Sequence, residues 1–282
     1  MKKLNIVIKL KLLLLNYNRY KKMTNLEKYY NKFKEENRLK TRHGNVEFST
    51  TMKYILDYIP QNKNPQEVKI LDIGAGTGRY SVELCNQGFD VTAVELVKHN
   101  LEILRAKHTN VKTWQGNALD LHFLEDETFD VTLLFGPMYH LHGDQNKIQA
   151  LNEAKRVTKT GGIILVAYVM NEYSVISYCF KEHKWQEVVE KGGLSEDFHI
   201  ISTDEDLYDY VRLSDIRRLS DACNLRNLKT IAPDGAADYM RKELNEMSEE
   251  EFQAFKKFQL AICEVPELLG ASSHTVDILQ KV

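Results

Sequence analysis

Between Val68 and Val169 the apolar residues repeatedly change their spacing, and this pattern constrains the fold more than any other feature of the chain. Short, nearly continuous apolar runs alternate with longer segments whose apolar residues recur every three or four positions. The short runs are typical of strands covered on both faces, and the longer segments are typical of crossover helices. The expected strands are 68–73, 89–94, 111–115, 129–135 and 163–169, and the expected helices are 79–86, 98–107 and one that Asp144 caps and Gly161-Gly162 ends. We therefore predict a mostly parallel sheet with helices on both faces.

Beyond Met170 the alternation breaks, and this part of the chain is expected to complete a seven-stranded sheet and to supply a lid. The expected elements are helical lid insertions at 171–204 and 236–269, a helix at 214–224, and strands at 228–232 and 275–282. A chain of 282 residues can bury a full hydrophobic core. No repeat, low-complexity linker or Pro-rich boundary interrupts residues 23–282, so we predict one α/β domain over that range.

Residues 1–22 differ sharply in composition from the rest of the chain. They contain seven Lys or Arg and no acid, so the remaining residues carry a formal charge of −9 within a whole-chain charge of −2. Met23-Thr24-Asn25-Leu26-Glu27 reads like a second start, with Thr24 as a candidate helix N-cap. We interpret residues 1–22 as an N-terminal extension without function, and a weak surface-binding helix is the alternative.

Residues 23–44 are expected to form a lid helix over the site. The segment 27–40 looks helical, and Tyr29, Tyr30 and Phe33 could close over a bound cofactor or simply pack. Arg42-His43-Gly44 is expected to join this helix to the core.

Composition also excludes several classes of protein. A nucleic-acid partner is not expected because residues 23–282 are acidic overall, and binding to phosphates needs a basic face. The four cysteines are widely spaced without a C-x-x-C pair, which argues against a disulfide framework and predicts a cytoplasmic protein. The apolar run 6–15 is interrupted by Lys9 and Lys11 and is too short to span a bilayer, so we expect no membrane partner. These patterns do not determine the oligomeric state.

The segment Asp72-Ile73-Gly74-Ala75-Gly76-Thr77-Gly78-Arg79 carries the first chemical signal. A glycine-rich turn between a strand and a helix lets the backbone approach a ligand closely and directs helix N–H groups at it. A dinucleotide site would have its third glycine where Arg79 stands. Here Gly78 is the third glycine, Asp72 precedes the turn, and Glu95 ends the second strand, where a carboxylate can bind both ribose hydroxyls.

With strand, acid, glycine turn, helix, strand and acid in this order, segment 68–169 resembles the class I S-adenosylmethionine (AdoMet)-dependent methyltransferases. The resemblance implies a Rossmann-like fold and AdoMet as the cofactor. It places the methionine and ribose portions of AdoMet over a floor made by Gly74, Ala75, Gly76 and Gly78. Asp72 would fix the turn, although it could simply cap it.

The resemblance also implies residues at the ribose and adenine. Glu95 would hold the ribose hydroxyls, with a merely solvated carboxylate as the alternative, and Leu96 would pack on the adenine. Asn117-Ala118 would lie at the adenine edge, where the family usually has Asp. The Asn oxygen can still accept a hydrogen bond from the adenine amino group, but Asn117 could equally be an ordinary turn residue. Arg79 and Phe135 complete the predicted cofactor site.

The loop Phe135-Gly136-Pro137-Met138-Tyr139-His140-Leu141-His142 follows the fourth strand and should face the reacting methyl group. In similar methyltransferases a Pro-x-Tyr-His loop lines the acceptor pocket, so Tyr139 and His140 are the candidate catalytic residues. His140 could take a proton from the acceptor or orient it, or it could be a hydrogen-bonded structural residue. The pattern His140-x-His142-x-Asp144 could bind metal in principle, but no further ligand is evident, and we predict no metal site.

The predicted function is AdoMet-dependent transfer of a methyl group to a small-molecule acceptor by in-line displacement. The loop after the fourth strand lacks the Asn/Asp-Pro-Pro-aromatic pattern of enzymes that methylate exocyclic amines of nucleic-acid bases. An RNA or protein methyltransferase and a catalytically silent AdoMet-binding module are the alternatives. The sequence does not identify the acceptor.

Overall fold

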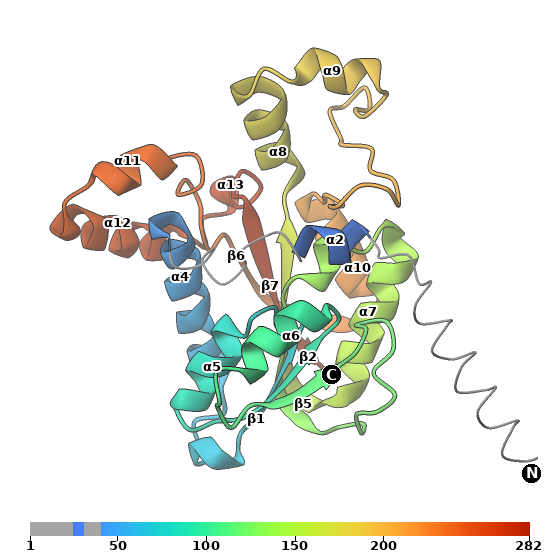
Figure 1. Cartoon of the computed structure of the whole chain (residues 1–282), viewed down its shortest axis with the longest axis vertical. Helices are drawn as coiled ribbons and strands as arrows, with labels where there is room; N and C mark the ends of the chain where they lie inside the picture. The colour runs from blue at the N-terminus through green and yellow to red at the C-terminus, as the bar shows by residue number, and fades with distance from the viewer. Residues whose placement is uncertain (1–24, 31–40) are drawn as a thin grey trace, which may run out of the picture.

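A computed structural model describes residues 25–30 and 41–282, and it is built around one twisted sheet (Figure 1). The sheet has seven strands in the order β3-β2-β1-β4-β5-β7-β6. Neighbouring strands from β3 to β5 are parallel, and β7 is antiparallel to both β5 and β6. The strands are β1 (Lys69–Ile73), β2 (Asp90–Glu95), β3 (Lys112–Gln115), β4 (Phe129–Leu134), β5 (Thr158–Val169), β6 (Leu225–Ile231) and β7 (His274–Lys281). The predicted Rossmann-like fold, a mostly parallel seven-stranded sheet, is confirmed.

Helices cover both faces of the sheet, as the apolar pattern predicted. The longer helices are α4 (Arg42–Tyr58), α5 (Arg79–Asn86), α6 (Lys98–Arg105), α7 (Gly143–Val157), α10 (Leu213–Ala222) and α12 (Glu249–Ile262). The shorter ones are α2 (Asn25–Tyr30), α8 (Asn171–Ser174), α9 (Trp185–Glu190), α11 (Arg241–Glu246), α13 (Pro266–Leu269), the π-helix η3 (Val175–Lys181) and the 3-10 turns η1 (Pro65–Glu67) and η2 (Pro137–Tyr139). Within the described residues, no helix is both long and apolar enough to cross a membrane.

Two buried clusters explain why the sheet holds helices on each face. On one face Leu151 of α7 and Ile216 of α10 pack with alternate residues of the central strands. On the other face Ile55 of α4 and Leu84 of α5 pack with the intervening residues of the same strands. Alternation along each strand sends successive side chains to opposite faces, so strands buried on both sides read as continuous apolar runs.

Several local predictions were wrong. Arg42-His43-Gly44 was predicted to connect the lid helix to the core, but it is the first turn of α4. There the Thr41 hydroxyl accepts a hydrogen bond from the Gly44 amide at 3.2 Å. The Arg42 guanidinium donates to the carbonyl oxygens of Leu244 and Met247, so contacts with the distant α11 region hold this helix start. The predicted helix 27–40 is helical through Tyr30, and its remainder and Phe33 lie outside the described residues, as do residues 1–22 and Thr24.

The boundaries of α7 also differ from the prediction. Asp144 does not cap the helix: the N-cap residue is His142, and the Asp144 carboxylate in the first turn pairs with Arg218 of α10. The glycines do not end the helix either, because α7 ends at Val157 and β5 begins at Thr158 and runs through Gly161 and Gly162. Pairing of Thr158 with Phe129 of β4 extends this strand beyond its apolar part.

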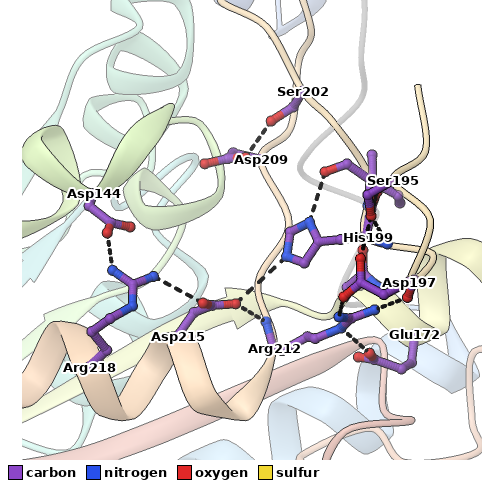
Figure 2. Close-up of polar contacts among 12 residues, drawn as sticks. Asp144, Glu172, Ser195, Asp197, His199, Ser202, Asp209, Arg212, Asp215 and Arg218 are labelled. Carbon is purple, nitrogen blue, oxygen red and sulfur yellow. Dashed lines mark hydrogen bonds and ion pairs between the residues drawn. The ribbon is translucent and has the colours of Figure 1, made fainter. Parts of the chain in front are cut away.

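The insertion after β5 is helical only through Glu190. From there to α10 the chain is irregular, and a polar network fixes it (Figure 2). The Arg212 guanidinium binds Glu172 of α8 at 2.7 Å and Asp197 of the irregular segment at 2.5 Å. The sequence pattern missed this segment because its conformation depends on side-chain pairs distant in sequence rather than on an apolar period.

A second part of the network anchors the end of the irregular segment near the sheet. Asp209 accepts a hydrogen bond from Ser202, as Figure 2 shows, and pairs with Lys147 of α7, whose side chain is only 2% exposed. The Asp209 amide donates to the carbonyl oxygen of Tyr139 at 2.9 Å. This anchor brings residues 207–210 against the loop that follows β4.

Candidate cofactor and acceptor site

A cavity lies beyond the carboxyl ends of β1, β2 and β4, where open α/β sheets bind ligands. Every predicted cofactor residue except Gly78 lines it, together with both candidate catalytic residues. These lining residues are Asp72, Gly74, Ala75, Gly76, Arg79, Glu95, Leu96, Asn117, Ala118, Phe135, Tyr139 and His140. The fold therefore brings Asp72 and His140, which are 68 positions apart in sequence, to one cavity.

The glycine turn follows β1 with a backbone that requires glycine. Gly74 has φ +77°, and a Cβ atom there would lie 2.4 Å from Cδ of Pro137 and 2.8 Å from the carbonyl oxygen of Phe135. Gly76 has φ +55° and lines the cavity. Gly78 serves packing instead, since its Cβ would lie 2.2 Å from Cδ1 of Leu104 on α6. Only glycine fits such contacts and such φ values without strain.

Two buried carboxylates fix this turn. Asp72, 1% exposed, accepts a hydrogen bond from the Ser81 hydroxyl of α5 at 2.5 Å, and burial raises the pKa of Asp72 to about 6. Glu95, 5% exposed, accepts from the Gly76 amide at 2.7 Å and from the Val97 amide at 2.6 Å. The Glu95 carboxylate is thus held at the cavity wall by two backbone donors, one of them in the glycine turn.

The predicted adenine end is more open. Leu96 is 41% exposed, Ala118 is buried, and the side-chain oxygen of Asn117 accepts from the Leu119 amide at 3.0 Å. Asn117 therefore forms a turn in this structure, and its contact with adenine stays a prediction. Arg79 lies with its guanidinium 4.0 Å from the ring centroid of Phe48, so a cation–π contact sets its direction.

Sequence reasoning missed Asn100 of α6, which also lines the cavity. The residue is 2% exposed, and its side-chain oxygen has no hydrogen-bond partner among the described residues. A buried polar atom of this kind is costly unless something binds it. No motif marks Asn100, although a polar residue on the core side of an amphipathic helix is a usable signal. Asp72, Glu95, Asn100 and the glycine backbone supply donors and acceptors of the kind that a nucleoside and an amino-acid chain need.

Comparison with known proteins supports this interpretation. Residues 70–162 match the family model of a methyltransferase domain. The chain is 30% identical over 118 residues to the ubiquinone biosynthesis O-methyltransferase of Rickettsia akari, covering 40% of this chain and 46% of that protein. It is 32% identical over 99 residues to the demethylmenaquinone methyltransferase of Renibacterium salmoninarum, covering 35% and 40%. These alignments span less than half the length of either relative.

Solved structures share the fold at low identity. A Thermotoga maritima protein described as a possible histamine N-methyltransferase aligns with a TM-score of 0.55 at 19% identity, covering 90% of this chain and 98% of that one. An AdoMet-dependent methyltransferase from Methanosarcina mazei gives 0.53 at 14% identity, covering 81% and 97%. This chain carries a class I methyltransferase domain. The cofactor of such domains is AdoMet, and the polar residues of the cavity fit it.

In this methyltransferase domain, His140 lies in the loop after β4, and its hydrogen bonds define its tautomer. The Nδ1 of His140 lies 2.8 Å from the carbonyl oxygen of Leu207, which can only accept, so Nδ1 carries the proton. Nε2 then accepts from the Tyr30 hydroxyl of α2 at 2.9 Å. Burial lowers the pKa of His140 to about 4, so the ring is neutral near pH 7. His140 links the lid helix to the loop, and its catalytic role stays a prediction.

The His140-x-His142-x-Asp144 pattern does not converge on a metal. Nε2 of His142 lies 3.1 Å from the carbonyl oxygen of Asp206, and Asp144 pairs with Arg218. Elsewhere among the described residues, ligand atoms of Glu47, Asp234 and His274 lie within 4.8 Å of one another. Of these, Asp234 and His274 are joined by a hydrogen bond from Nδ1 of His274 at 2.7 Å.

A second cavity of about 560 Å³ adjoins the cofactor cavity of the methyltransferase domain. The two share Tyr30 and Tyr139 as wall residues. Its lining comes from α2, α4, α8, α11, the ends of β5 and β7, the loop after β4 and the anchored segment that contains Tyr208 and Tyr210. Thus parts of both predicted lid segments, 171–204 and 236–269, border it through residues such as Tyr173 and Arg241.

Proposed function

We propose that this protein transfers a methyl group from AdoMet to a small-molecule acceptor. The observation that carries the proposal is the pair of adjoining cavities, which share Tyr30 and Tyr139 beyond the carboxyl ends of the strands. The cofactor would occupy the cavity over the glycine turn, and the acceptor would occupy the second cavity. A volume of about 560 Å³ is in the usual range of small-molecule sites.

The proposed cofactor contacts follow the lining of the first cavity. Gly74, Ala75 and Gly76 provide backbone that can approach the ligand, and Glu95 would hold the ribose hydroxyls. The two amides that bind the Glu95 carboxylate orient both of its oxygens at the cavity wall. When bound, AdoMet supplies a methyl group that is already electrophilic, so the main task of the protein is alignment of the reactants, worth about 7–11 kcal/mol.

Tyr139 and His140 are proposed to shape the acceptor end of the site. With both ring nitrogens of His140 engaged and its pKa near 4, the imidazole is better suited to hold Tyr30 and the loop in place than to take a proton near pH 7. Closure of α2 over the site would then depend on the bond between Tyr30 and His140.

A small acceptor is favoured over RNA or protein because lid segments and the end of the sheet wall the second cavity. The names of the two curated relatives also refer to the small molecules ubiquinone and demethylmenaquinone. A single domain over 23–282, a functionless extension at 1–22 and a cytoplasmic location are retained as parts of the proposal.

The test separates binding from turnover. Calorimetry of the full chain should show binding of AdoMet and S-adenosylhomocysteine without comparable binding of NAD. Incubation with labelled AdoMet and fractionated extract should then place the label in the small-molecule fraction. Label in RNA or protein would support those alternatives, and cofactor binding without any labelled product would indicate a silent module.

A further inference from the structure

Arg79 is the only Lys or Arg among the described residues that line the cofactor cavity. Within the described part of the chain, no carboxylate pairs with its guanidinium, and its buried Nε has no hydrogen-bond partner. Other partly buried arginines bind carboxylates of the protein: Arg156 pairs with Glu153, and Arg212 pairs with Glu172. Arg79 therefore brings to the cavity a positive charge that the described residues do not neutralise by an ion pair.

A row of aromatic rings holds the Arg79 side chain. Its guanidinium carbon lies 4.0 Å from the ring centroid of Phe48 on α4. The ring of Phe48 lies 5.1 Å from that of Tyr80, and Tyr80 lies 5.2 Å from Phe135, which follows β4. A ring face attracts the cation without supplying an oxygen acceptor, so the planar set of N–H donors still needs acceptors. The aromatic row thus orients Arg79 without meeting its hydrogen-bonding needs.

Arg79 and Glu95 lie on opposite sides of the glycine turn. In the sheet β1, which leads into this turn, lies between β2 and β4. Glu95 ends β2 and accepts a hydrogen bond from the Gly76 amide at 2.7 Å. The aromatic row that holds Arg79 instead reaches the end of β4 at Phe135. A ligand whose ribose lies at Glu95 and whose chain crosses the turn would bring the end of that chain to Arg79.

We propose that Arg79 binds the α-carboxylate of AdoMet and makes this protein select ligands that carry that group. This inference rests on the proposed function. The carboxylate is the only anionic group of AdoMet, whereas its sulfonium and ammonium groups are cations that Arg79 would repel. A guanidinium can bind a carboxylate through two parallel N–H···O hydrogen bonds, which adds direction to the attraction. The contact would therefore also fix how the methionine chain lies across the turn.

The first test compares two ligands that differ only in the carboxylate. S-adenosylhomocysteine carries the group, and 5′-S-(3-aminopropyl)-5′-thioadenosine is the same molecule without it. Calorimetry of the full chain should show that S-adenosylhomocysteine binds at least about tenfold more tightly than the analogue. Equal affinities, or tighter binding of the analogue, would overturn the inference.

Variants of Arg79 test whether this residue is the source of the preference. Arg79→Met should bind S-adenosylhomocysteine at least about tenfold more weakly than the wild type and should bind the analogue no more weakly. Arg79→Lys retains the charge without the planar fork and should keep only part of the preference. The control Arg105→Met changes an exposed arginine of α6 that does not line the cavity, and it should bind both ligands like the wild type.

Thermal unfolding followed by circular dichroism reports whether each variant is folded. A folded Arg79→Met variant that keeps the full preference for S-adenosylhomocysteine would refute the assignment. If Arg79→Met does not fold, Arg79→Lys decides, and an undiminished preference in that variant would refute the assignment equally.

Glu95→Ala and the wild type separate failure of this inference from failure of the proposed function. Both ligands carry the ribose, so Glu95→Ala should weaken their binding by the same factor and leave the preference intact. Binding of both ligands to the wild type with equal affinity would overturn the role of Arg79 and leave the proposed function standing. Absence of binding of either ligand to the wild type would instead refute the proposed function itself.

Discussion

Acidification should destabilise this protein through His140. Burial lowers the pKa of this histidine from 6.5 to about 4, so the unfolded chain binds the proton more readily than the folded one. Protonation therefore favours unfolding: the contribution of His140 to stability is complete above pH 6.5 and declines as the pH falls toward 4. The whole difference corresponds to about 3 kcal/mol, of which about 2 kcal/mol is lost between pH 7.5 and pH 5.0.

The experiment must cancel the contributions of other titratable groups to the pH dependence of stability. Burial raises the pKa values of Asp72 and Asp277 to about 6, and a raised carboxyl pKa acts with the opposite sign in the same pH range. A variant that changes His140 alone retains those contributions. His140→Gln keeps a donor and an acceptor in the side chain, so the hydrogen bonds to Leu207 and Tyr30 have a substitute.

The assay is urea unfolding of wild type and His140→Gln at pH 7.5 and pH 5.0. Between these pH values the free energy of unfolding should fall by about 2 kcal/mol more in the wild type than in the variant. His122→Gln is the control, because the His122 side chain is 78% exposed, and it should follow the wild type. An equal loss in wild type and His140→Gln would refute the reasoning that burial keeps this ring neutral.

Four further predictions concern the site and the N-terminus. Glu95→Ala should weaken AdoMet binding at least about tenfold by calorimetry while the chain stays folded, whereas the control Glu83→Ala on α5 should leave AdoMet affinity unchanged. Unchanged affinity in Glu95→Ala would show that Glu95 does not bind the cofactor. Gly76→Val should abolish AdoMet binding because φ is +55° and the backbone must approach the ligand, and near-normal affinity would contradict that geometry. His140→Ala should mainly raise the acceptor KM if His140 orients the loop, whereas a fall in kcat of about 10²–10⁴-fold at constant AdoMet affinity would identify a general base. Deleting residues 1–22 should leave Tm and AdoMet affinity within error, and a clear loss of either would show that the extension belongs to the fold.

Local patterns were sufficient for the central sheet because each strand carries its own evidence of burial. The run that contains β1 is apolar on both faces, and the glycine turn after it permits the positive φ that Gly74 adopts. The same pattern located Asp72 and Glu95 at strand ends, which places them at the cavity. Boundaries failed where partners distant in sequence decide them, as at Arg42, whose carbonyl partners belong to residues 244 and 247.

The sequence by itself determined the sheet, its helices and the segments that line the cofactor cavity, since periodicity and turn chemistry are local properties. Only the tertiary structure decided how the acceptor cavity is built. Its wall combines Glu47 of α4, Tyr210 of an irregular segment and His274 of β7, which no motif connects. The tautomer of His140 also depends on the tertiary structure, because its hydrogen-bond partners Leu207 and Tyr30 come from segments on either side of it in the chain. A hydrogen bond across such separations depends on packing, and packing energy is shared among contacts that a linear pattern does not record.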